Sequence, residues 1–138
     1  CIRDREIFTL AMLNDLIKTR FNVQENRSEY ICEQEQGGQK QEHPLGENMV
    51  GCVHTLIADQ RGIRKTLYDA ALKKEQEEIN QNGLKVYGDW LLEQVNKAPY
   101  LQVSPHDVDP ESDLKRVMKI ILWQRAQRRL KAAKQQQP

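Results

Sequence analysis

The chain contains the ligand types of a zinc site at Cys32, His43, Cys52 and His54. Thiolate and imidazole are the groups that Zn²⁺ prefers, and four of them close a tetrahedral site. The spacing argues against this chemistry, because zinc knuckles supply ligands in pairs about two to four residues apart, whereas Cys32 and His43 are eleven positions apart. On a helix, the side chains of Cys52 and His54 would diverge by about 200°. We therefore expect a buried Cys52, a surface His54, and neither a metal nor another cofactor.

A second cluster, His106, Asp107 and Asp109, could bind a cation or act in general acid–base chemistry. The presence of Asp109 is already explained by a structural role, because an aspartate directly before Pro110 is typical of a helix N-cap. Catalysis would also need a pocket and a nucleophile or metal within reach. The sequence has no phosphate-binding glycine loop, no nucleophile elbow and no zinc-protease motif. We expect no catalytic residues and no enzymatic activity.

The basic C-terminal helix, residues 111–138, carries the largest charge asymmetry of the chain. It contains eight Lys or Arg residues and two acidic ones, whereas residues 1–110 contain thirteen basic and eighteen acidic residues. Clustered like charge indicates an anionic partner, which is an acidic protein, a nucleic acid or a membrane surface. The residues expected to bind this partner are Trp123, Arg125, Arg128, Arg129, Lys131 and Lys134.

This helix divides into an apolar half and a basic half. Six of the seven residues ending at Trp123 are apolar, too many for a solvent-facing helix, so we expect this half to be buried in the body or in a partner. Both tryptophans, Trp90 and Trp123, are aromatic anchors in either a core or an interface, and a core position is the commoner of the two. The basic half is expected to be solvated or to contact phosphates or carboxylates. Replacing Arg125, Arg128 and Arg129 with Gln should then leave the fold intact and weaken partner binding.

Two classes of function remain open. The first is a non-enzymatic helical interaction module that binds another macromolecule, a protein in the first place, through exposed helix faces and the basic C-terminal helix. The alternative is a nucleic-acid-binding domain whose Lys and Arg residues contact phosphates. The acidic remainder of the chain weighs against it, because duplex binders present a broader basic face. A basic stripe that continues onto Arg61, Arg64 and Lys65 would favour nucleic acid.

A calmodulin-type target helix would use the same residues. Hydrophobic anchors at Val117 and Leu130, or at Trp123 and Leu130, have plausible intervals for such a helix. Gln124 and Arg128 have the spacing of an IQ-type motif. The later glycine and arginine of that motif are absent, so this match is weak.

The first half of the chain supplies one helix and a polar segment. Apolar residues at helical spacing predict a helix from Asp4 to Phe21. Residues 22–48 form a polar insertion with few hydrophobes. It is either a loop or a small β-hairpin that reverses at Gly37–Gly38, because this pair can supply positive φ at both turn positions. The residues beside the two glycines have poor strand propensity.

The second half is predicted to be helical. A heptad-like apolar pattern predicts one long helix from about Glu47 to Gln81, which Asn82–Gly83 would close. Leu84–Lys97 forms a second amphipathic segment. The last helix is expected to start at the N-cap Asp109 and to run to about Lys131.

These elements indicate an all-α fold: a bundle of about four helices in a single domain over residues 1–138, with the polar insertion after the first helix. The apolar content of 38% is low. It suits a core that a partner or a second copy completes, so homo-oligomerisation is an open alternative.

The sequence also bears on location. The longest apolar run, Ile120–Trp123, is far shorter than the roughly 18–20 residues that cross a bilayer, so we expect no membrane span. Three cysteines without repeated spacing argue against a disulfide framework. We therefore expect an intracellular protein, cytoplasmic or nuclear. Because the first residue is Cys1 and not Met, we expect the chain to be an excerpt.

Overall fold

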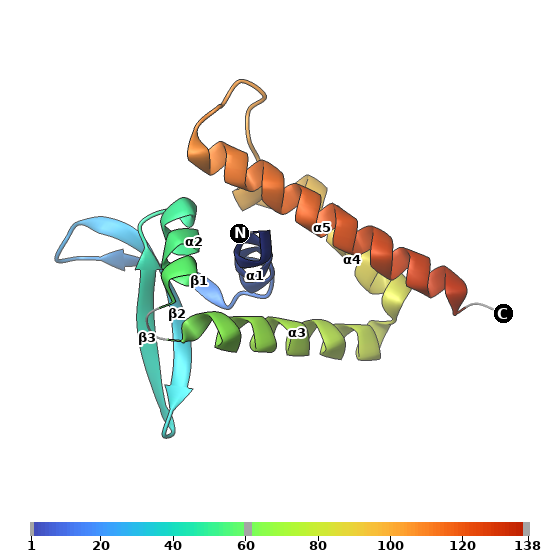
Figure 1. Cartoon of the computed structure of the whole chain (residues 1–138), viewed down its shortest axis with the longest axis horizontal. Coiled ribbons are helices and arrows are strands. Elements are labelled where there is room, and N and C mark those ends of the chain that lie inside the picture. Colours follow the sequence, from blue (N-terminus) through green and yellow to red (C-terminus); the bar gives the residue numbers. More distant parts are fainter. Residues whose placement is uncertain (1, 60–61, 137–138) are drawn as a thin grey trace. The chain divides into compact units, whose positions relative to one another are not determined.

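A computed structural model describes residues 2–59 and 62–136 of the chain. It contains two compact units, Cys1–Leu72 and Lys73–Pro138, which we describe separately. Within the described residues there are five α-helices and a three-stranded antiparallel sheet (Figure 1). The expected all-α class is therefore wrong, and the fold is of the mixed α+β class. The single-domain organisation over residues 1–138 stays a prediction.

The first helix of unit 1 is shorter than the sequence suggested. Helix α1 spans Ile2–Leu13 and ends where Asn14 Nδ2 donates a hydrogen bond to the Leu10 carbonyl at 2.8 Å. Asp15 then adopts a left-handed conformation, with φ of 56°. The next residues form strand β1, Ile17–Asn22, so the predicted helix from Asp4 to Phe21 is wrong from Asn14 onward.

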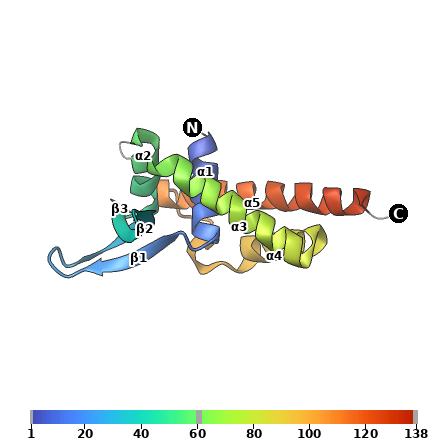
Figure 2. The ribbon, with the colours of Figure 1, turned by 90° about the horizontal axis from the view of Figure 1, so that it is seen from below.

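The polar insertion contains most of the sheet, in which strands β2 (Arg27–Gln36) and β3 (Gln39–Gly46) follow β1 in the order β1-β2-β3. Gly37–Gly38 connects β2 to β3, and both glycines have positive φ, which suits a two-residue hairpin turn. The hairpin alternative is confirmed and the loop alternative is wrong. The turn between β1 and β2 projects away from the helices of unit 1 (Figure 2). Ion pairs from Arg20 to Glu29 on β2 and to Glu42 on β3 link the three strands.

The predicted long helix is two helices, α2 (Met49–Ala58) and α3 (Ile63–Asn82). Asp59 ends α2 in a left-handed conformation, with φ of 44°, and its Oδ1 accepts a hydrogen bond from the Arg64 N–H at 3.1 Å. Gly62 also has positive φ, at 67°. The apolar pattern continues across this break because the buried residues of both helices keep one heptad-like spacing. These residues are Met49, Val53, Leu56, Ile63 and Leu67.

Polar contacts join α1 to the first half of α3 within unit 1. The buried carboxylate of Asp4 lies 3.1 Å from the Arg64 Nε. The guanidinium of Arg3 lies 5.5 Å from the centre of the Tyr68 ring, a cation–π distance. Arg64 is therefore a structural cation of unit 1.

Unit 2 contains the end of α3, then α4 (Leu84–Lys97), the short 3₁₀ helix η1 (Pro99–Leu101) and α5 (Pro110–Gln135). The predicted helix at Leu84–Lys97 is confirmed. The N-cap at Asp109 is confirmed as well, since its Oδ1 accepts a hydrogen bond from the Ser112 N–H at 2.9 Å. Helix α5 continues past the predicted end at Lys131. None of the helices in the described residues is long and apolar enough to cross a membrane.

Helices α4 and α5 lie side by side (Figures 1 and 2). Their backbones approach closely at Gly88, where an added Cβ would lie 2.7 Å from the Cγ of Leu130 and 3.4 Å from the Ala126 carbonyl oxygen. Only a residue without a side chain fits this position without displacing Leu130.

Candidate partner-binding surface

One side of α5 belongs to the interior of unit 2. Leu114, Met118, Leu122 and Ala126 are spaced four residues apart and are all buried. Residues four apart lie on one face of a helix. The packing of α5 therefore leaves only its opposite side available to a partner.

The same buried side holds an ionic cluster that joins three helices. The carboxylate of Glu75 on α3 accepts two hydrogen bonds from Arg125, from Nε at 2.5 Å and from Nη2 at 2.8 Å. It also accepts hydrogen bonds from the Tyr87 hydroxyl at 2.8 Å and from Arg129. Glu75 and Arg125 are only 3% and 6% exposed. We call these four residues the Glu75 cluster.

The electrostatics of the Glu75 cluster favour the charged carboxylate. Burial on its own would raise the pKa of Glu75, but the hydrogen bonds and charge of Arg125, with those of Tyr87 and Arg129, hold it below its ordinary value. Burial, together with the adjacent Glu75 charge, raises the pKa of the Tyr87 hydroxyl. Glu75 is thus an anion and Tyr87 a neutral donor at neutral pH.

The cluster divides the six residues that the sequence nominated for partner binding. Arg125 is buried on Glu75 and Arg129 is partly buried on the same carboxylate, so both are engaged inside unit 2. Replacing them would leave Glu75 buried without its counter-charges. The expectation that Arg125 and Arg129 can be changed with the fold intact must therefore be corrected. The other four residues, Trp123, Arg128, Lys131 and Lys134, are exposed.

The exposed side of α5 combines apolar and cationic residues. A stripe of residues spaced by three and four shares one face of the helix, and its members are Ile120, Trp123, Gln127, Lys131 and Lys134. We define the docking face as this stripe with the adjacent Arg128; its residues are Ile120, Trp123, Gln127, Arg128, Lys131 and Lys134. Ile120 is 56% and Trp123 is 51% exposed. The core alternative is therefore wrong for Trp123, and also for Trp90, which is 36% exposed.

The cations of the docking face lack partners within the described part of the chain. Arg128, Lys131 and Lys134 form no ion pair with residues 2–59 or 62–136. The sequence also contains no acidic residue after Asp113. Arg116 on the same helix differs, since it contacts the Asp113 carboxylate and the Ser104 and Asp107 carbonyls. The docking face is therefore a cationic surface with no internal compensation.

Other candidates from the sequence are Arg61, Arg64 and Leu130. Arg64 is paired with Asp4, and Arg61 lies outside the described residues. Leu130, the anchor of the calmodulin-type reading, faces Gly88 of α4. A partner that encircles α5 would have to displace this contact.

The cysteine and histidine residues lie in unit 1. Cys32 and His43 are cross-strand partners on β2 and β3, while Cys52 is buried in α2 and His54 is exposed. No group of three or more His, Cys, Asp or Glu among the described residues could hold a metal ion. The loop residues His106 and Asp107 are exposed, and the Asp107 carbonyl serves to bind Arg116.

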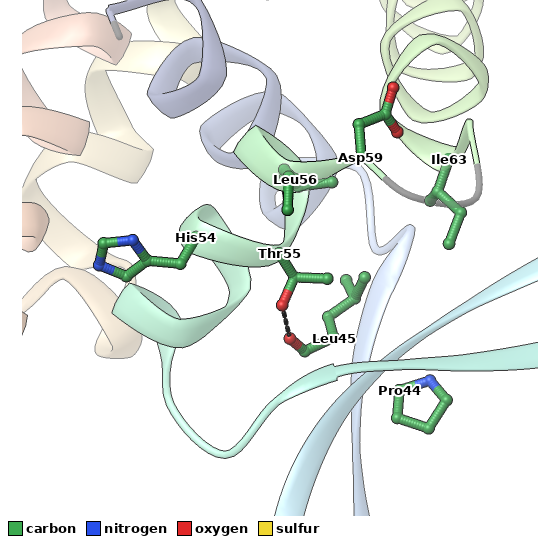
Figure 3. A pocket seen from close by; sticks show the side chains of 8 residues that line it. Pro44, Leu45, His54, Thr55, Leu56, Asp59 and Ile63 are labelled. Carbon is green, nitrogen blue, oxygen red and sulfur yellow. Dashed lines mark hydrogen bonds between the residues drawn. The ribbon is translucent and has the colours of Figure 1, made fainter.

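Unit 1 has a cavity of about 400 Å³ between the end of β3, α2 and the start of α3 (Figure 3). Its lining includes the buried side chains of Leu45, Leu56 and Ile63. The Thr55 hydroxyl donates to the Leu45 carbonyl at 2.5 Å, and the His54 ring points away from the other labelled side chains. The polar groups of this cavity do not converge on one point, so its geometry defines no reaction.

From the sequence, Glu75 and Tyr87 were not identified as members of a buried ionic cluster. A signal for Glu75 was present, because Ile63, Leu67, Ala71 and Glu75 are spaced four residues apart and all are buried. An acidic residue that continues such an apolar row predicts a buried carboxylate that needs cationic partners.

Comparisons with models of protein families, with curated proteins and with solved structures found no match. The surface of α5 is therefore the main guide to function.

Proposed function

We propose that this chain is a non-enzymatic interaction module that binds another protein through the docking face of α5. The observation that carries the proposal is the exposure of Ile120 and Trp123 on the helix that also carries three cations with no partner in the described residues. Exposed aromatic side chains beside arginine are the residue types that dominate the energy of protein interfaces. The partner surface should be acidic and should offer a site for the Trp123 indole.

A protein partner is favoured over a nucleic acid by the composition of the face. Two of its six residues, Ile120 and Trp123, are exposed large hydrophobes, whereas a duplex-binding helix devotes its exposed side to phosphate and base contacts. On the sheet, Arg20 and Arg27 are already engaged, because each is paired with two carboxylates. Nucleic acid therefore remains the second candidate, supported by the three cations of the docking face.

A non-catalytic role is supported by the use of the perturbed groups. Active sites place groups with shifted pKa values within reach of a substrate. Here Glu75 and Tyr87 are buried on each other and on Arg125, and Asp109 is an N-cap. The pKa shifts of these three groups therefore result from contacts that stabilise the fold.

The proposal includes an intracellular location and allows a second copy as partner. Three cysteines without repeated spacing suit a reducing compartment. A second copy would bring an equally cationic docking face, so contact between two such faces is disfavoured over contact with an acidic protein.

Site-specific photo-crosslinking tests the proposal. A photoreactive residue would replace Gln127 on the docking face in one variant and the exposed Asp89 on α4 in a matched control. Each variant would be irradiated in an extract of the source cells, with and without nuclease. We expect discrete protein adducts from position 127, resistant to nuclease and absent from position 89. Equal adducts at both positions, or adducts lost with nuclease, would contradict it.

A further inference from the structure

The docking face has a direction along α5. Its apolar residues, Ile120 and Trp123, lie near the middle of the helix, and its cations lie in the last turns. From Trp123, Lys131 and Lys134 are eight and eleven residues away, or about 12 and 16 Å along the axis at 1.5 Å per residue. A complementary partner must therefore separate its apolar anchor from its carboxylates by roughly the same distance.

The partner element is best matched by a helix. The convex surface of α5 has its backbone groups bonded within the helix, so it offers none to a strand laid across it. A bound strand would leave part of its own N–H and C=O groups without partners, whereas a helix satisfies them internally. Because the opposite side of α5 packs inside unit 2, the contact is helix against helix rather than enclosure in a groove.

Electrostatics select the orientation of that helix. In an antiparallel arrangement, its N-terminal turn lies over Arg128, Lys131 and Lys134, so its carboxylates sit at the positive end of its own dipole. In a parallel arrangement, the same carboxylates would fall in its last turn, where the dipole disfavours them. The antiparallel arrangement also places the two helix dipoles in opposition.

From this relationship, and resting on the proposed function, we propose that the docking face binds an amphipathic helix of a partner protein with an acidic first turn, antiparallel to α5. Its apolar anchors follow about eight to eleven residues after the carboxylates. The partner is thus an acidic peptide helix that binds in one orientation, antiparallel to α5.

Synthetic peptides test this inference with the full chain. The acid-first peptide carries glutamates in its first turn and leucine anchors about eight to eleven residues later. The acid-last peptide has the same composition with these groups exchanged, and a neutral peptide has glutamine for glutamate. Affinity is measured by fluorescence anisotropy of the labelled peptides, with duplex DNA and phosphatidylserine vesicles as competitors.

We expect the acid-first peptide to bind about ten-fold more tightly than the acid-last peptide, and the neutral peptide more weakly than either. A nitroxide at the N-terminus of the acid-first peptide should broaden the amide signals of Lys131 and Lys134 rather than those near Leu114. The combined variant Arg128→Gln, Lys131→Gln, Lys134→Gln should lose the preference between the two glutamate peptides.

Three results would overturn the inference: equal binding of the two glutamate peptides, no binding of either up to about 1 mM, or displacement by DNA or vesicles at lower concentration than by unlabelled acid-first peptide. The photo-crosslinking outcome at position 127 is independent of these peptides. Adducts there, with failure of the peptides, would overturn the helix and its direction while the protein-binding proposal stands.

Discussion

Arg125 binds the carboxylate of Glu75, fifty residues earlier in the chain, through two of its guanidinium nitrogens. This pair lies in the interior of unit 2, where Tyr87 and Arg129 complete the hydrogen bonding of the carboxylate. The Glu75 cluster removes two arginines, Arg125 and Arg129, from the basic surface of α5 and leaves the docking face with three cations. In the proposed function, the fold and partner binding therefore use different members of one basic group of residues.

Glu75→Gln is expected to lower the free energy of unfolding of unit 2 by about 3–5 kcal/mol, because it leaves Arg125 buried without a counter-charge. Both tryptophans lie in unit 2, so their fluorescence in a urea titration reports this change. The control is Glu77→Gln, an exposed position on the same helix, expected within about 0.5 kcal/mol of the parent. Similar losses in the two variants would show that the Glu75 cluster does not stabilise the unit.

The same pair predicts a pH dependence. The pKa of Glu75 is lowered in the folded state from an ordinary value of about 4.3, so the pair contributes its full stability above that pH. As pH falls through the folded pKa, the contribution is lost. The difference in unfolding free energy between the parent and Glu75→Gln should be constant from about pH 5 to 7 and shrink below about pH 4. A difference that stays constant down to acid pH would contradict the assigned charge state.

Trp123→Ala is expected to cost less than about 1 kcal/mol of stability, since half of this side chain is already exposed. Its neighbour Leu122 is fully buried, and Leu122→Ala should cost about 2–5 kcal/mol. Only the Trp123 variant should weaken the adduct formed from position 127 without loss of fold. A large stability loss for Trp123→Ala in the urea titration would contradict the surface position of this side chain.

Gly88→Ala should destabilise unit 2 by about 1–3 kcal/mol, because the new methyl group would overlap Leu130. Leu130→Ala removes the obstacle. In a double-mutant cycle, the combined variant should therefore lose less stability than the sum of the two single variants. Strict additivity would indicate that α4 and α5 do not meet at this point.

Part of this fold could be predicted from the sequence. Helix α4 and the start of α5 follow from local signals, since apolar spacing and the N-cap Asp109 act within a few residues. Strand β1 could not be separated from a helix, because Ile17 and Phe21, four residues apart, fit both periodicities. The sheet also outweighed the poor strand propensity beside Gly37–Gly38, through its turn and its cross-strand ion pairs.

The candidate site was harder to predict than the helices. Local charge located the basic cluster but could not show that Arg125 and Arg129 face a carboxylate on another helix. The same limit applied to Trp123, because an apolar run does not reveal which of its members face outward. The division between the Glu75 cluster and the docking face depends on contacts between residues distant in sequence.

The central claim is that the cations of the docking face bind an acidic protein, and the yield of the position-127 adduct tests it most directly. The yield is compared for the combined variant Arg128→Gln, Lys131→Gln, Lys134→Gln and for a control that removes three exposed lysines on α3 and α4, Lys73→Gln, Lys85→Gln, Lys97→Gln. We predict a loss of about ten-fold or more for the first variant at low salt, little change for the control, and a smaller difference at high salt, where screening is stronger. Equal adduct yields from the two variants at low salt would contradict the claim.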